Sequence, residues 1–428
     1  MIKRYREPFP LMFLLQLYLL GTCIFYLIGP IIWKTENNLL TFSMVLVYQL
    51  ALYLGYKYAS KRSVDNARFS RIFDKEWFIR KFIPISLLVL GAKLIFIARV
   101  GSMYGYSNPF DIIFDVFQSS KALYFAEKIV TGGEEMVGGF ALSVLLSVIS
   151  GITFIYLPLY LIYFKELPIR KKIIGFITVI FVIFSKLLFG TNEGFFDIIL
   201  CFFAWSILRN NGIKRNSIKL IIYFLIMLVA IILAFNYIMS ERNGSFYQFQ
   251  QLGENIIDEG SFWFDILPEE LSTLLVWLVF YVCQGYYGMS LALEYFTIPY
   301  LGLTFSMFIY RNLNALLGLD IIDETLMSYT NQFGWYYGTN WHTAYTWFAS
   351  DFTWIGVIPI MFLYGMLLYK SFLAAYYEKS PIAIGMFILL VTAIIFLPAN
   401  NKIFASAEMC SAFFTYLLIW FLGKRKYD

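Results

Sequence analysis

Residues 9–33 read FPLMFLLQLYLLGTCIFYLIGPIIW, a run of 25 residues that contains no charged side chain. A helix needs about 20 apolar residues to cross the hydrocarbon core of a bilayer, which is about 30 Å thick. The run is longer than the apolar core of a signal peptide, and it lacks a small-residue cleavage site. We therefore expect an uncleaved first transmembrane helix.

Similar runs recur along the chain, which has 428 residues, 60% of them hydrophobic and 14% charged. In lipid only helices and closed barrels satisfy the backbone, and the runs are continuous rather than alternating, which favours helices. The sequence therefore predicts a single all-α polytopic integral membrane domain over residues 1–428, with about ten to twelve transmembrane helices. The candidate spans are roughly 10–33, 38–57, 82–100, 137–164, 173–190, 194–208, 217–239, 346–369, 381–398 and 407–423.

The distribution of lysine and arginine orients these helices, because cytoplasmic loops are enriched in both residues. The basic segments are 57–81, 165–172, 209–219 and the tail 424–426. They alternate with acidic or neutral segments, so we expect cytoplasmic N- and C-termini. The segments expected outside are 101–136, 241–270 and 313–345. The stretch 271–312 is interrupted by glycine and proline, so we expect it to dip into the outer leaflet or pack on the bundle; two full crossings are the alternative.

The cysteines give no sign of a metal site or a disulfide framework. Four cysteines lie apart in apolar runs, without CxxC spacing, which predicts buried free thiols. The chain has no GxxxxGK[ST] loop for a nucleotide, and its basic residues form short topogenic clusters rather than a phosphate-binding face. We therefore expect no metal, no cofactor and no nucleic-acid partner, and we expect the lipid bilayer as the surroundings.

The single histidine, His342, closes a stretch dense in aromatic and amide side chains, which reads QFGWYYGTNWH over residues 332–342. Aromatic faces and amides stack on and hydrogen-bond to sugar rings, so Tyr337, Asn340 and Trp341 are candidate substrate-binding residues. The ordinary pKa of an imidazole is near 6.5, so a neutral His342 can accept a hydroxyl proton at neutral pH. His342 is therefore the candidate catalytic residue; the alternative is a polar residue at the membrane edge.

Asp351 follows His342 by nine residues. In a helix that begins at His342, nine residues rotate by about 900° and place Asp351 on the opposite face, about 13 Å away. We therefore expect Asp351 to position or pack the helix, and a role in substrate binding is the alternative.

Four cations are expected at or near the outer side: Arg99, Arg242, Arg311 and Lys186. The planar guanidinium group matches phosphate oxygens, so the arginines are candidate ligands of a phosphate-containing substrate. Arg242 is the strongest candidate, because it is the one cation among seven carboxylates in residues 241–270. Pairing with a neighbouring carboxylate or with anionic headgroups is its alternative role.

Ionisable residues also occur within the predicted spans. Lys93 lies near the middle of the third span, and Asp197 follows Glu193 by four residues, so these two carboxylates share a helix face. A charge in the membrane is costly and usually faces a partner or a cavity. We therefore expect Lys93 to pair with Asp197, either as a structural contact or in a substrate cavity, and Glu193 is a candidate substrate-binding residue.

The stretch from His342 to Gly356 resembles the O-antigen ligase and polymerase superfamily. Its members carry a histidine, usually followed by asparagine, with an acidic residue nine positions on and glycines eleven and fourteen positions on. His342, Asp351 and Gly356 match this pattern. Thr343 and Thr353 stand in place of the asparagine and the first glycine.

Two other stretches bear on the resemblance. Residues 284–302 resemble the repeat-unit polymerase branch of the superfamily, often called Wzy. The family frequently has a Gly-Ser-Arg or Gly-Arg segment at the outer start of a span, where this chain has GTNEG at 190–194, without arginine. The hydropathy profile resembles that of the family over nearly the whole chain.

The resemblance implies a glycosyltransferase of the C-type (GT-C) membrane fold in the bacterial inner membrane. It would polymerise undecaprenyl-diphosphate-linked repeat units into O-antigen, capsule or exopolysaccharide outside the cytoplasm, alongside a flippase and a chain-length regulator. His342 would activate or orient the acceptor hydroxyl, and Arg242, with Arg311 or Arg99, would stabilise the departing diphosphate. The alternatives are a ligase-type transferase to a surface acceptor and a polysaccharide transporter or flippase.

Overall fold

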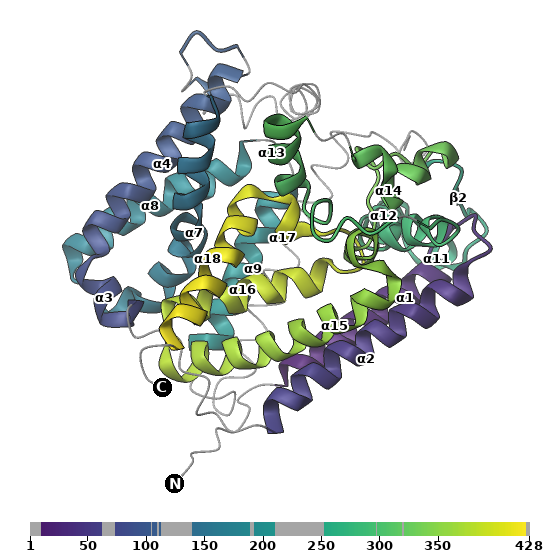
Figure 1. Cartoon of the computed structure of the whole chain (residues 1–428), viewed down its shortest axis with the longest axis horizontal. Helices are drawn as coiled ribbons and strands as arrows, with labels where there is room; N and C mark the ends of the chain where they lie inside the picture. Colours follow the sequence, from purple (N-terminus) through teal and green to yellow (C-terminus); the bar gives the residue numbers. More distant parts are fainter. Residues whose placement is uncertain are drawn as a thin grey trace. The chain divides into compact units, whose positions relative to one another are not determined.

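The structure is a computed structural model, 79% helical with almost no strand, in agreement with the all-α membrane architecture that the sequence predicts (Figure 1). It describes residues 10–61, 73–103, 105–108, 111–112, 139–188, 192–209, 252–296, 298–318 and 321–424. The expected span 217–239 lies outside the described residues, as do most of the expected outer segment 101–136 and the first part of 241–270.

Five helices among the described residues are long and apolar enough to cross a membrane, judged by length and composition. They are α1 (Leu11–Ile28), α2 (Asn38–Lys61), α4 (Phe82–Met103), α12 (Glu269–Ala292) and α15 (Ala344–Leu373), which a π-helical turn extends over Ala374–Glu378. Every expected span that falls on described residues coincides with a helix. The remaining elements are α3 (Lys75–Arg80), α7 (Gly139–Tyr163), α8 (Ile169–Leu187), α9 (Asn192–Arg209), α11 (Phe262–Ile266), α13 (Met307–Leu317), α14 (Leu326–Tyr329), α16 (Pro381–Phe396), α17 (Lys402–Ala405), α18 (Ala407–Lys424), β1 (Ile31–Ile32), β2 (Ile256–Ile257) and the 3₁₀ turns Phe164–Glu166, Ile322–Glu324 and Thr330–Phe333.

The two faces of α1 show why these helices need a lipid environment. One face is buried by the protein and includes Leu15 and Leu19. The opposite face exposes Phe13, Leu17 and Ile24, each more than half exposed and spaced by four or seven residues. A stripe of large apolar side chains is unfavourable in water, by about 25 cal/mol for each Å² exposed, and is favourable against lipid. The protein is therefore membrane-embedded.

The chain divides into two compact units by its internal contacts. The first unit comprises Met1–Val64, Asn243–Lys370 and Leu389–Ser406. The second unit comprises Asp65–Arg242, Ser371–Ile388 and Ala407–Asp428. The single domain that the sequence predicts thus contains two bodies of helices, and each is described by itself below.

In the first unit, α1 and α2 lie side by side, and the connection between them carries β1, which pairs antiparallel with β2 (Figure 1). Helix α12 packs against the pair near this connection. The thiol of Cys283 donates to the carbonyl oxygen of Thr22 (3.3 Å), and the side-chain amide of Asn37 donates to the carbonyl oxygen of Ser290 (3.1 Å). The 271–312 stretch is therefore one long helix anchored at the 29–37 connection, followed by an irregular segment and α13.

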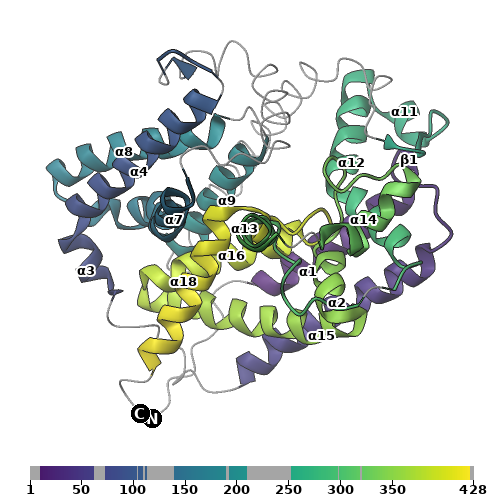
Figure 2. The same cartoon turned by 45° about the horizontal axis from the view of Figure 1, so that its top comes forward.

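In the second unit, α4 packs against α8, and α7 packs against α18 (Figure 2). Small residues allow close packing: a Cβ atom on Gly175 would lie 2.3 Å from the ring of Tyr160. The buried hydroxyl groups of Ser86 and Tyr156 are paired, with their oxygens 2.6 Å apart. This bundle surrounds the charged residues described below.

Candidate functional site

His342 lies just before α15, and it is 1% exposed. Hydrogen bonds hold its two chain neighbours against α12. The backbone N–H of Thr343 donates to the carbonyl oxygen of Gly285 (3.3 Å), and the backbone N–H of Trp341 donates to Oε1 of Gln284 (3.0 Å). The histidine is therefore fixed against α12 at the point where the preceding loop ends.

A hydrogen bond to Thr330 determines the state of the imidazole. Nε2 of His342 lies 2.8 Å from Oγ1 of Thr330, which is also 2.7 Å from the carbonyl oxygens of Met327 and Trp335. The single hydroxyl proton goes to a carbonyl, so Nε2–H donates to Thr330 in a neutral imidazole, a tautomer assigned from this network. Burial lowers the pKa of His342 to about 3, which keeps the ring neutral at neutral pH. Nδ1 has no hydrogen-bond partner in the described part of the chain.

Gly288 of α12 lies directly against the histidine. A Cβ atom on Gly288 would be 2.8 Å from Cδ2 of His342 and 2.8 Å from Nε1 of Trp335, closer than a side chain can approach. Gly288 belongs to the stretch 284–302, and His342 opens the stretch 342–356. The structure therefore brings into contact the two stretches on which the predicted family resemblance rests.

The three candidate sugar-binding residues near the histidine form the loop itself. Asn340 is buried, and Tyr337 and Trp341 are partly exposed. The ring of Trp341 meets Tyr281 of α12 edge-on with ring centroids 5.3 Å apart, and its carbonyl oxygen accepts from Nε1 of Trp335 (3.2 Å). These contacts attach the loop to α12, so they leave less of the aromatic surface for a ligand than the sequence alone indicates.

A pocket of about 480 Å³ lies in the first unit, between the α1–α2 connection, the end of α12 and the His342 loop. This volume falls within the range of about 300–1,000 Å³ that is common for small-molecule sites. Its lining combines aromatic rings with carboxylates. The lining residues are Trp33, Lys34, Thr35, Glu36, Glu254, Tyr287, Leu291, Glu294 and Phe333. None of these residues stands out in the sequence, because they come from four separate segments.

His342 lies behind the wall of this pocket rather than in it. Tyr287 lines the pocket, and the next residue, Gly288, touches the imidazole. The hydroxyl group of Thr330 contacts both the imidazole and the carbonyl oxygen of Trp335. The ring of Trp335 in turn packs edge-on against Tyr287, with ring centroids 4.8 Å apart. The position of the histidine therefore affects the pocket through Tyr287 and Trp335.

Asp351 is completely buried and binds a different segment. Its carboxylate accepts hydrogen bonds from the N–H of Thr304 (3.0 Å), the hydroxyl of Thr304 (2.7 Å) and the N–H of Phe305 (2.5 Å). The turn before these residues contains Leu301 and Gly302 with φ of 52° and 106°, a region that L side chains rarely adopt. Asp351 therefore holds this strained turn against α15.

The candidate cations are dispersed. Arg311 is exposed on α13 in the first unit, and Arg99 is partly exposed on α4 in the second unit. Arg242 and the side chain of Glu193 lie outside the described residues. No arginine lines the pocket, so the described residues do not join these cations to the histidine loop.

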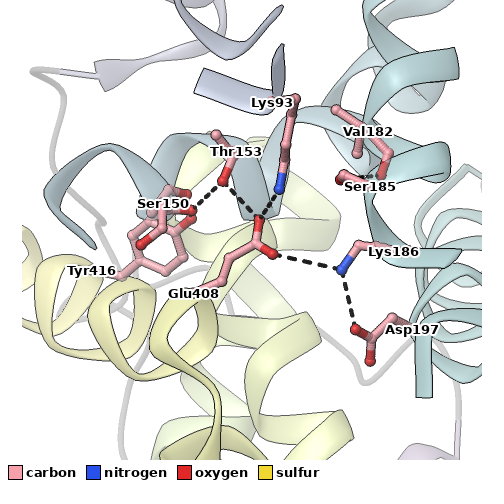
Figure 3. Close-up of polar contacts among 10 residues, drawn as sticks. Lys93, Ser150, Thr153, Val182, Ser185, Lys186, Asp197, Glu408 and Tyr416 are labelled. Atoms are coloured by element: carbon pink, nitrogen blue, oxygen red, sulfur yellow. Dashed lines mark hydrogen bonds and ion pairs between the residues drawn. The ribbon is translucent and has the colours of Figure 1, made fainter. Parts of the chain in front are cut away.

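The second unit contains a buried charge network, formed by Lys93 of α4, Lys186 of α8, Asp197 of α9 and Glu408 of α18 (Figure 3). The Nζ atom of Lys93 lies 3.3 Å from Oε1 of Glu408. The Nζ atom of Lys186 lies 3.1 Å from Oδ2 of Asp197 and 3.8 Å from Oε2 of Glu408. The hydroxyl of Thr153 donates to Oε1 of Glu408 (2.7 Å). Two lysines and two carboxylates neutralise one another, which reduces the cost of their burial.

The network corrects two expectations. The predicted partner of Lys93, Asp197, instead pairs with Lys186, and Lys93 pairs with Glu408, 315 residues away in the sequence. Lys186, expected among the outer cations, is 9% exposed inside the bundle. Consecutive helices α8 and α9 bring Lys186 and Asp197 within reach, and this proximity decides the pairing. Glu408 could have been found, because it is a carboxylate within the expected span 407–423.

The described residues contain no group of three or more His, Cys, Asp or Glu side chains that could hold a metal ion. All four cysteines are buried and free, as the sequence predicts. The pocket and the neutral imidazole behind it are therefore the features on which a function can be based.

No family model, no curated protein and no solved structure matches the chain. The family assignment stays a prediction from residues 284–302, residues 342–356 and the hydropathy profile.

Proposed function

We propose that this chain is a membrane glycosyltransferase that joins lipid-diphosphate-linked repeat units into a surface polysaccharide on the outer side of a bacterial plasma membrane. In this proposal the fold is of the C-type glycosyltransferase class, and both termini are cytoplasmic. The observation that carries the proposal is the pocket, because Tyr287, Leu291 and Glu294 of the stretch 284–302 and Phe333 of the loop before His342 form part of its wall.

The lining of the pocket suits a sugar. Tyr287 and Phe333 provide aromatic surface beside Leu291, and Glu36, Glu254 and Glu294 provide acceptors for sugar hydroxyl groups. The wall thus combines aromatic surface with polar groups that can fix the orientation of a ligand. We therefore assign the pocket to the acceptor sugar.

In this proposal the departing diphosphate binds outside the pocket. Three carboxylates against one lysine repel a ligand with several negative charges. The arginines Arg242, Arg311 and Arg99 remain the candidates for the diphosphate, because a guanidinium group binds two phosphate oxygens at once and stabilises the charge that develops on the leaving group.

His342 is a positioning residue in this proposal. Its Nε2 is occupied by Thr330, and its ring lies behind Tyr287, so a pocket carboxylate is better placed to accept the proton of the acceptor hydroxyl. The histidine fixes Thr330 and Trp335, and through them the wall of the acceptor pocket. This assignment refines the role as candidate base that the sequence indicates.

A strain that lacks the chain tests the proposal. Loss of long surface polysaccharide, with single repeat units still present on their acceptor, is the expected result. Lipid-linked polymer that remains unattached would identify a ligase instead. Repeat units trapped on the cytoplasmic side would identify a flippase, a class for which charged residues within spans, such as those of the buried charge network, are common.

A further inference from the structure

We propose that the pocket in the first unit is a subsite for a sugar that carries a free amino group. The inference rests on the proposed function for the identity of the ligand as a sugar, and it adds the charge of that sugar. The charges, the fixed carboxylate and the aromatic wall of the pocket lead to it in turn.

The charge of the pocket is negative and is not neutralised internally. The lining contains three carboxylates, Glu36, Glu254 and Glu294, and one ammonium group, Lys34. In the described part of the chain, the ion pairs involve none of these four side chains. Lys34 therefore leaves all three carboxylates available to a cationic ligand.

One of the carboxylates is held in place. The side-chain amide of Asn37 donates to Oε1 of Glu294 (2.9 Å) and to the carbonyl oxygen of Ser290 (3.1 Å). A carboxylate has further acceptor positions when one is occupied, so Glu294 can still bind a ligand. This anchoring makes Glu294 a fixed acceptor at the end of α12.

The wall of the pocket also contains an aromatic ring that is fixed by packing. Trp33 lines the pocket and is 7% exposed, and its ring stacks on Tyr26 with centroids 5.0 Å apart. Its Nε1–H has no hydrogen-bond partner among the described residues. That nitrogen is itself buried, so Trp33 offers the pocket ring surface rather than a hydrogen bond.

A protonated amino sugar complements this combination. Its ammonium group can donate three hydrogen bonds to carboxylates, and its ring hydrogens can lie against aromatic surface. An acetylated amine lacks the charge, and a uronic acid or a phosphate-substituted sugar is repelled. The pocket therefore distinguishes sugars by charge.

Titration of the purified full chain in lipid nanodiscs tests this selectivity. The probes are a tetrasaccharide of glucosamine with free amines, the same tetrasaccharide fully N-acetylated, and a tetrasaccharide of galacturonic acid, in mildly acidic low-salt buffer. We expect the amine probe to bind tightest and the uronate probe weakest. Glu36→Gln and Glu294→Gln should each weaken binding of the amine probe by about 1.5- to 5-fold, the range for single exposed ion pairs, and should weaken binding of the acetylated probe less.

Glu259→Gln is the matched control, because Glu259 is exposed in the same acidic segment but does not line the pocket. It should leave all three affinities unchanged. Equal binding of the amine and acetylated probes, no binding of the amine probe, or an equal loss in the control would overturn the inference. A deletion strain that still makes full-length polymer would instead overturn the proposed function, without altering these affinities.

Discussion

Replacement of His342 by alanine should destabilise the first unit by about 3 kcal/mol. The change removes the hydrogen bond to Thr330, worth about 1 kcal/mol net, and leaves a cavity enclosed by Gly288 and Trp335. Large-to-small changes at enclosed sites cost about 2–5 kcal/mol, so the cavity contributes most of the loss. His342→Gln retains an amide donor for Thr330 and fills most of the space, so it should recover more than half of the stability.

Acid should destabilise the native protein through the same residue. Burial lowers the pKa of His342 from 6.5 to about 3, so the folded chain keeps the imidazole neutral where the unfolded chain protonates it. A depressed pKa of this kind contributes stability above pH 6.5 that is lost as the pH falls. Near pH 5 the difference of about 1.5 pH units corresponds to about 2 kcal/mol. His342→Gln has no imidazole and should lack this part of the pH dependence.

The assay is the apparent unfolding temperature of the full chain in nanodiscs, measured for wild type, His342→Ala and His342→Gln from about pH 5 to pH 8, together with the polymer that each variant makes in cells. Recovery of polymer by glutamine supports the positioning role. Two results would contradict the reasoning: glutamine as unstable and inactive as alanine, or a wild-type profile that matches the His342→Gln profile over this pH range.

Three further predictions concern the packing within each unit and the topology of the chain. Glu408→Gln should destabilise the chain by about 3–5 kcal/mol, because it leaves two buried lysines with less negative charge beside them. Glu166→Gln, in an exposed ion pair, should cost at most about 1 kcal/mol, and equal unfolding temperatures for the two variants would refute the network. Gly288→Ala should lower both the unfolding temperature and the polymer yield, whereas Gly21→Ala, with nothing within 4 Å of the new Cβ, should change neither. Unchanged values for Gly288→Ala would show that Gly288 and the imidazole are not in close contact. Cysteine at exposed Gly338 should react with an impermeant thiol reagent in intact spheroplasts, against the low background of four buried native cysteines, and protection until lysis would reverse the proposed topology.

The helices were predictable because their signal is local. Continuous apolar runs such as 9–33 determine where a membrane helix forms, and the structure places a helix on each predicted span that it describes. The long helix α12 was harder to interpret, because Gly285 and Gly288 look like interruptions in the sequence. In the structure they are sites of close contact with the chain around His342.

The site was predictable only in part, because its geometry depends on contacts between distant segments. The sequence identifies His342 as the single imidazole, but its burial depends on Thr330, Trp335 and Gly288 together. The pocket joins residues as far apart as Glu36 and Phe333, and no pattern in one sequence relates them. The partner of Lys93 was missed for the same reason, since depth in the membrane limits the choice of partner but does not select among helices.

Transfer by the purified chain tests the proposed function without the rest of the cell. Lipid extract from the deletion strain, which should contain lipid-diphosphate-linked repeat units, is reconstituted with the chain in liposomes without nucleotide sugar or ATP, and the products are separated by length. We predict a ladder of glycans that grows with time and is shortened by His342→Ala. Unchanged single units, or elongation that requires a nucleotide sugar, would contradict the assignment of this chain as the polymerase.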